Sequence, residues 1–150
     1  MAKVARAARV ASRQRTETIT GNKTIQSAET GELYLLDGQD CTITLPAAQD
    51  GAYFKFLVIT KIASPAVVIQ AAGSAKVAGH ARIATKGGTV VIETDADAEI
   101  GDNHTKLTIA DSGSNHLLAG SAIECYSNGT NWYVTAELAR DNSGVTVIFN

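Results

Sequence analysis

The chain has few of the residues that crosslink small domains. Its 150 residues include only two cysteines, Cys41 and Cys125, which lie 84 positions apart. This spacing matches neither a disulfide framework nor a zinc motif. A chain of this length buries enough surface to fold without crosslinks. The sequence therefore predicts no metal and no cofactor, and it predicts that both thiols are small buried side chains.

Aromatic residues are scarce as well, at 5% of the chain, and long apolar runs are missing. No segment has the roughly 18 consecutive apolar residues of a membrane-spanning helix, so no contact with a membrane is predicted. The N-terminus lacks the apolar stretch of a secretory signal. With 45% hydrophobic and 19% charged residues, the composition is typical of one globular domain.

Acidic residues are absent from one end of the chain. Residues 1–15 carry five basic residues and no acid, whereas residues 16–150 carry a net charge of −7. The basic residues are Lys3, Arg6, Arg9, Arg13 and Arg15. This division predicts a basic N-terminal arm (1–15) and an acidic body (16–150), with the arm binding something anionic. The arm is rich in Ala and Arg but short, so we expect it to be ordered only against a partner.

The body is rich in residues that favour β-structure. Thirty-nine residues are Val, Ile or Thr, and only nine are Leu. β-Branched side chains lose rotamer freedom in a helix and pack well on a pleated sheet. Alternation and turn residues predict nine strands: 32–36, 41–45, 52–60, 66–70, 89–94, 106–110, 122–127, 132–138 and 145–149. No helical segment separates them, so the pattern fits a sandwich, jelly roll or barrel and excludes a βαβ design. Of these, we expect an all-β, antiparallel sandwich similar to a jelly roll.

Two details of this prediction can be tested directly. The segment Ala52–Thr60 is the longest and most apolar, so it is expected to be a central strand. Asn128-Gly129 is expected to form the tight turn of a hairpin, since both residues tolerate a positive φ.

The sequence contains little that could carry out catalysis. It has no G-x-S-x-G, H-E-x-x-H or phosphate-binding glycine motif, and its three histidines lie next to Gly, Asn or Ser. The acidic cluster Asp95, Asp97, Glu99 and Asp102 resembles the start of a calcium loop, but Ile100 and Lys106 stand where glycine and glutamate are needed. The cluster is therefore expected to be a solvated strand or loop, and no enzyme activity is predicted.

Three aromatic residues are predicted to cluster beside the Asn128-Gly129 turn: Tyr126, Trp132 and Tyr133. Packing over one end of the sandwich is the simpler interpretation. A surface on which a ligand stacks is the alternative.

Several segments together resemble β-rich structural proteins of tailed bacteriophages. They are Ile43–Ala48, Asp50–Phe56, Gly73-Ser74 and Asn128–Val134, and the resemblance covers roughly residues 32–135. It is to capsid decoration (cement) proteins and to domains of head or tail fibres. The resemblance implies a non-enzymatic protein of the virion that is usually a homotrimer.

Size and charge favour the cement protein over the fibre. The chain has neither heptads nor repeats, and it is compact. The expected function is therefore to bind the major capsid protein on the outer surface of the head, through the basic arm, and to stabilise the shell. The alternative is a fibre or adhesion module that binds a host glycan through Tyr126, Trp132 and Tyr133.

Two weaker alternatives remain at this point. A small hydrolase could use the acidic cluster around Asp95 and Asp102. The arm could instead neutralise a few phosphates of a nucleic acid, although the acidic body opposes this and no specific nucleic-acid partner is predicted.

Overall fold

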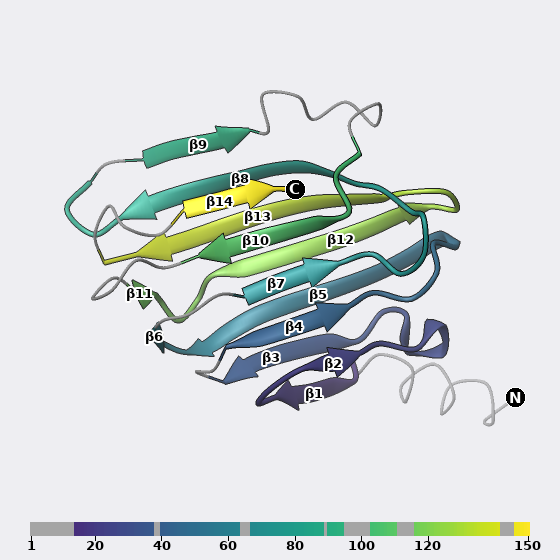
Figure 1. Ribbon diagram of the computed structural model, residues 1–150. Helices are drawn as coiled ribbons and strands as arrows, with labels where there is room; N and C mark the ends of the chain where they lie inside the picture. The colour runs from purple at the N-terminus through teal and green to yellow at the C-terminus, as the bar shows by residue number, and fades with distance from the viewer. Residues whose placement is uncertain are drawn as a thin grey trace, which may run out of the picture.

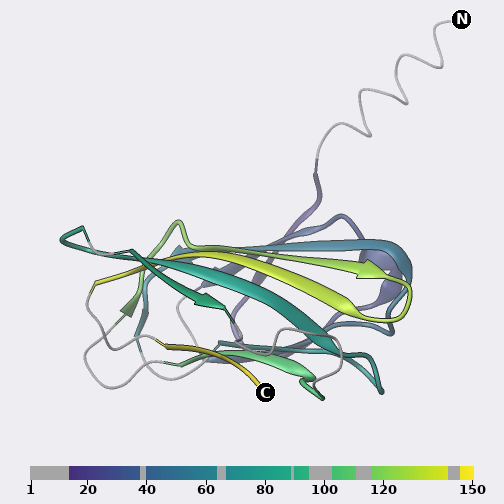
Figure 2. The same ribbon diagram turned by 90° about the horizontal axis from the view of Figure 1, so that it is seen from above.

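The protein is an all-β sandwich, as expected. The computed structural model describes residues 14–37, 40–63, 67–88, 90–94, 103–110, 116–141 and 146–150. These residues form two sheets packed face to face and one short 3-10 helix, η1 (Ser27–Glu29) (Figure 1). Figure 2 shows the two layers edge-on. None of the described helical residues forms an apolar helix long enough to cross a membrane.

The larger sheet has seven principal strands, in the spatial order β1, β3, β5, β12, β13, β8 and β9. Their bounds are Thr16–Ile19, Leu33–Asp37, Asp50–Thr60, Ala122–Asn128, Trp132–Arg140, Val77–Thr85 and Val90–Thr94. Two short strands extend it at one corner, β6 (Ile62–Ala63) and β11 (His116–Leu117).

The smaller sheet has the order β14, β10, β7, β4 and β2. The bounds of these strands are Thr146–Phe149, Lys106–Ala110, Val67–Gln70, Cys41–Thr44 and Lys23–Thr24.

In the N-terminal half the chain winds around the sandwich so that neighbouring strands are parallel, which differs from the antiparallel sandwich expected. We call this arrangement the parallel coil. The chain alternates between the two sheets, from β1 to β2, β3, β4, β5 and β7. As a result β1, β3 and β5 are parallel neighbours in one sheet, and β2, β4 and β7 are parallel neighbours in the other. Parallel strands need a crossover connection. Here each crossover is itself a strand of the opposite sheet, so no helix is needed.

The C-terminal half is mostly antiparallel, as expected. β12 pairs antiparallel with both β5 and β13, and β10 does so with both β7 and β14. The hairpin between β12 and β13 turns at Asn128-Gly129, where Gly129 has a φ of 90°. The parallel pair β8–β13 is the exception in this half.

All nine predicted strands are present, with ends that differ by at most two residues. The predicted central strand, β5, lies between β3 and β12. Five strands were not predicted. Four of them, β1, β2, β6 and β11, are short, and the fifth, β8, is nine residues long. Its sequence, VAGHARIAT, is rich in Ala and Gly, which have low β-propensity.

The core lies between the sheets and follows the alternation of each strand. On β5, Phe54, Phe56 and Val58 point inward and are buried, whereas their neighbours point outward. Tyr34 and Trp132 are the largest inward side chains beside them, and both contact Phe54. Burial of these aromatic side chains supplies much of the stabilisation of the sandwich.

Candidate functional site

The predicted basic arm joins the body at β1. Four of its basic residues, Lys3, Arg6, Arg9 and Arg13, lie outside the described residues. Arg15 is described, and its carbonyl accepts a hydrogen bond of 2.9 Å from the Leu33 N–H. Its guanidinium lies 3.6 Å from a carboxylate oxygen of Glu32, and the side chain is 82% exposed. Arg15 thus already follows the parallel register of β1 with β3, and the rest of the arm begins from a fixed point on the body.

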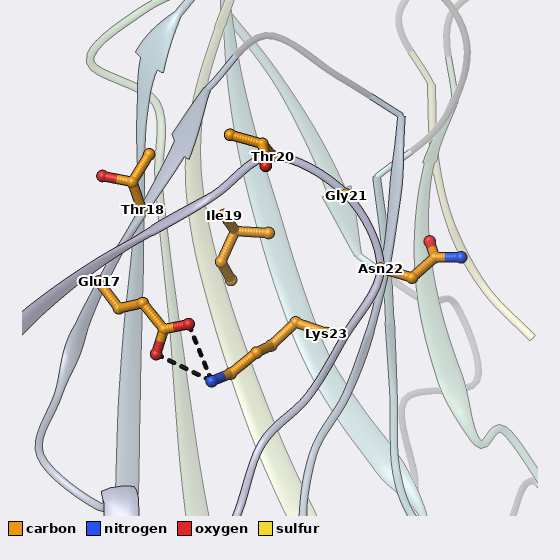
Figure 3. A pocket seen from close by; sticks show the side chains of 7 residues that line it. All are labelled: Glu17, Thr18, Ile19, Thr20, Gly21, Asn22 and Lys23. Carbon is orange, nitrogen blue, oxygen red and sulfur yellow. Dashed lines mark hydrogen bonds and ion pairs between the residues drawn. The ribbon is translucent and has the colours of Figure 1, made fainter.

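Charged residues close the sandwich beside this point. Glu17 on β1 is in register with buried Tyr34, and Lys23 on β2 is in register with buried Ile43, so both side chains point toward the space between the sheets. The Lys23 ammonium lies 2.8 Å from Glu17 and 3.1 Å from Glu29. Figure 3 shows Glu17 and Lys23 facing each other across the arch that joins their strands. We call Glu17, Lys23, Glu29 and Glu32 the polar cap.

The polar cap is held together by charge and by an aromatic ring. The Lys23 ammonium lies 5.6 Å from the centre of the Tyr34 ring, a cation–π distance. The hydrogen bond to Glu17 raises the pKa of Lys23 despite partial burial. Burial alone would raise the pKa of Glu29, but hydrogen bonds from the Gln26 backbone and from Lys23 lower it. Lys23 and Glu29 are therefore both charged at neutral pH.

The three carboxylates of the polar cap could in principle hold a cation. Glu17, Glu29 and Glu32 each offer an oxygen, and these oxygens lie within 4.8 Å of one another. Lys23 already contacts two of the three at hydrogen-bond distance. Its ammonium already binds two of the carboxylates that a metal ion would need, although three carboxylates and one ammonium leave the cap negatively charged. The arrangement is that of a structural ion-pair network and gives no support for a metal site.

The three predicted aromatic residues do not form one surface. Trp132 is 0% exposed and packs on Phe54, with ring centres 5.6 Å apart. It is a core residue and is not accessible to a ligand. Tyr126 and Tyr133 are 43% and 36% exposed on the outer face of the larger sheet.

The two exposed tyrosines are fixed by different partners. The hydroxyl of Tyr126 donates to Glu124 at 2.6 Å, which raises the pKa of Tyr126 to about 12. The hydroxyl of Tyr133 accepts a hydrogen bond of 3.2 Å from the Asn128 side chain. Tyr53, which the sequence did not single out, lies beside Tyr126 with ring centres 4.9 Å apart. Rings this close on adjacent strands cover part of one another, which leaves less of the Tyr53 and Tyr126 rings open for a ligand to stack on.

The segments that carry the phage resemblance meet at one end of the sandwich. The turn at Gly129 lies against Asp50, and a shallow hollow there is lined by 47–48, 72–75 and 129–130. Within the turn, the Asn128 side chain accepts hydrogen bonds from the N–H groups of Thr130 and Asn131, and the Asn131 side chain accepts one from Lys76 N–H. These contacts join three connections, so these residues have a structural role here.

Two sets of candidate residues remain, the acidic cluster and the two cysteines. The acidic cluster Asp95, Asp97, Glu99 and Asp102 lies outside the described residues. Cys41 and Cys125 are buried and free, as expected, and burial raises the pKa of both thiols, that of Cys41 to about 11. A thiol that is protonated and buried is unreactive.

Together these features define a β-sandwich whose N-terminal half is a parallel coil closed by a polar cap. Comparisons with protein-family models, with curated proteins and with solved structures found no match to this chain.

Proposed function

We propose that this protein is a capsid cement protein of a tailed bacteriophage. Its β body would sit as a homotrimer on the outer surface of the head, and its basic arm would bind the major capsid protein and so stabilise the shell. The proposal includes no enzymatic step.

One observation carries the proposal: the separation of charge between an arm and a body that are joined at Arg15, whose backbone is hydrogen-bonded to the body. Residues 1–13 hold four basic residues and no acid, and the body is acidic. The connection at Arg15 is part of β-pairing with Leu33. A tether of this kind holds the body close to whatever surface the arm binds.

The charges of the arm indicate the chemistry of its partner. Binding would pair arginines with carboxylates on the coat, at a cost in entropy for ordering the arm. A homotrimer would present three arms, and multivalent attachment raises weak individual affinities into strong binding. Binding should weaken as salt rises, since exposed charges are screened.

Cosedimentation with purified phage heads that lack this protein tests the proposal. The full chain should pellet with the heads, and a full-length variant with Lys3, Arg6, Arg9 and Arg13 all changed to Gln should remain in solution. A matched control changes Lys61 and Lys86, exposed basic residues of the body, to Gln and should still pellet. If the arm variant pellets as well as the unchanged chain, the proposed attachment is wrong.

A fibre module that binds a host glycan is the second candidate, because Tyr126 and Tyr133 are exposed and held in place. Rigid tyrosines are common at binding surfaces. This candidate predicts saturable binding to host-surface polysaccharide that falls at least tenfold in Tyr133→Ala. Head binding without any polysaccharide binding would eliminate it.

A further inference from the structure

The turn between β12 and β13 surrounds the side-chain amide of Asn128 with hydrogen bonds to both of its polar atoms. Its Oδ1 accepts from the N–H groups of Thr130 and Asn131, at 3.0 and 2.9 Å. Its Nδ2 donates to the hydroxyl of Tyr133 at 3.2 Å. Asn128 is nevertheless exposed at the end of β12. The amide is therefore held in one orientation and remains open to water.

The backbone nitrogen of Gly129 is the nearest nucleophile along the chain to this amide. Its N–H donates to the hydroxyl oxygen of Ser127 at 3.1 Å, so a proton acceptor lies beside it. Gly129 has a φ of 90°, which residues with a side chain rarely adopt, so no side chain shields the nitrogen. Attack of this nitrogen on the side-chain carbonyl carbon of Asn128 closes a ring within the chain, which avoids the entropy cost of bringing two molecules together.

We infer that Asn128-Gly129 is a self-modification site, at which the folded turn promotes the conversion of Asn128 to an aspartyl residue. The Gly129 nitrogen loses its proton to water by way of the Ser127 hydroxyl and bonds to Cγ of Asn128. The carbonyl electron pair moves onto Oδ1. When it returns, the bond between Cγ and Nδ2 breaks, and ammonia leaves with a proton from the Tyr133 hydroxyl, which regains one from water. The product is a cyclic succinimide.

The hydrogen bonds of the turn match the needs of this reaction. The N–H groups of Thr130 and Asn131 both point at Oδ1, where negative charge develops, and this is the arrangement of an oxyanion hole. The hydroxyls of Ser127 and Tyr133 contact the nitrogen that loses a proton and the nitrogen that gains one. Groups placed in this way act as general base and general acid. An unfolded chain keeps the Asn-Gly sequence but loses all of these contacts.

Water then opens the succinimide in one of two ways. Attack at Cγ restores the ordinary backbone with Asp at position 128, and its carboxylate can accept the same two N–H bonds. Attack at the backbone carbonyl carbon leaves an isoaspartyl linkage, which inserts a methylene into the main chain and would displace Gly129 from Asp50, against which it packs. Both products add a negative charge beside Asp50, the register neighbour of Asn128. The inference concerns the body alone and does not depend on attachment of the arm to a capsid.

Peptide mapping by mass spectrometry tests the inference on the full chain, aged at mildly alkaline pH and sampled over time. Conversion of Asn128 from amide to acid should be about tenfold faster in the folded protein than in the same chain unfolded in urea. Ser127→Ala and Tyr133→Phe should each slow the folded reaction severalfold and leave the rate in urea unchanged. Circular dichroism shows which variants are folded, and since the two remove different hydroxyls, either one alone tests the assignment.

Asn22 is the internal control in every sample. Its Oδ1 also accepts a backbone hydrogen bond, from the Thr42 N–H at 2.8 Å, but Lys23 follows it and its side chain shields the nitrogen. Asn22 should keep its amide while Asn128 is converted. The inference would be overturned by an Asn128 that converts more slowly in the folded protein than in urea, by equal conversion at Asn22, or by a folded rate that neither variant lowers.

Discussion

The two edges of the larger sheet differ in the side chains that they expose. At the β1 edge, outward Thr16 and Thr18 are exposed, and the space between the sheets is closed by Glu17 and Lys23. At the β9 edge, the outward side chains are Val90 and Ile92, and both are exposed. An exposed apolar edge strand invites pairing with another chain, whereas short polar edges resist it.

This difference indicates a division of roles within the sandwich. At the β1 edge, Glu17 and Lys23 close the space between the sheets, and the basic arm is attached there. The opposite edge ends on β9, where Val90 and Ile92 are exposed. Changes at the two edges should therefore have different consequences, and the following predictions are ordered by the expected size of the effect.

The largest effect is expected at Gly79, which attaches β8, and with it β9, to β13. A Cβ atom at this position would lie 1.8 Å from the carbonyl oxygen of Val134, which is backbone and cannot move aside. Gly79→Ala should lower the free energy of unfolding by about 3 kcal/mol or more. Urea denaturation measures the change.

Gly21, in the connection from β1 to β2, provides the matched control, because a Cβ there meets nothing within 4 Å. Gly21→Ala should leave the urea midpoint nearly unchanged. Equal midpoints for the two variants would show that β8 does not pack closely on β13.

A smaller but clear effect is expected from removal of the central cation of the polar cap. Lys23→Met keeps the aliphatic stem but leaves Glu17 and Glu29 without their partner, which should cost about 2 kcal/mol. Lys55→Met removes a more exposed pair with Glu124 and should cost only about 0.5 kcal/mol. If the two substitutions cost the same, the cap contributes no more than a surface ion pair.

Acid should destabilise the protein through the same groups. The pKa of Glu124 is lowered mainly by the hydrogen bond from Lys55, and that of Glu29 is lowered by hydrogen bonds from Gln26 and Lys23. A carboxyl whose pKa is lower in the folded state stabilises the fold above its unfolded pKa, and this stabilisation is lost as the pH falls through the folded pKa.

The urea midpoint should therefore decrease as the pH is lowered below about 4.5, the ordinary pKa of glutamate. Lys23→Met should show a smaller decrease than the unchanged chain, because its cap carboxylates have already lost their partner. An identical pH dependence in both proteins would contradict this assignment.

The smallest effect is expected for the side chain that links the arm to the body. Arg15 is largely exposed and lies 3.6 Å from Glu32, so Arg15→Ala should change the free energy of unfolding by less than about 0.5 kcal/mol. The hydrogen bond from Leu33 uses the backbone and is retained. A larger loss would mean that the side chain, and not strand pairing, fixes the root of the arm.

The positions of the strands were predicted better than the pairing between them. Alternation identifies which side chains of a strand are buried, so β4, β5 and β13 could be located from Cys41, Phe54 and Val134 and the residues beside them. Alternation does not indicate which strand lies alongside. The parallel coil follows from repeated crossing between sheets, and no local residue pattern marks it.

The candidate site was predicted only in part. Trp132 was grouped with Tyr126 and Tyr133 because they are close in sequence, but Trp132 and Tyr133 are adjacent on a strand and point to opposite faces. The polar cap was missed because β1 and β2 were not recognised. The alternation of Thr16–Ile19, with Glu17 and Ile19 on one side, is the signal that could have revealed it.

A cryo-electron microscopy map of the virion tests the central claim most directly. The account predicts the β-sandwich on the outer surface of the head, with residues 1–13 lying along neighbouring coat subunits. A map in which the head carries no such density, or in which the sandwich is bound while the arm contacts no coat subunit, would contradict it.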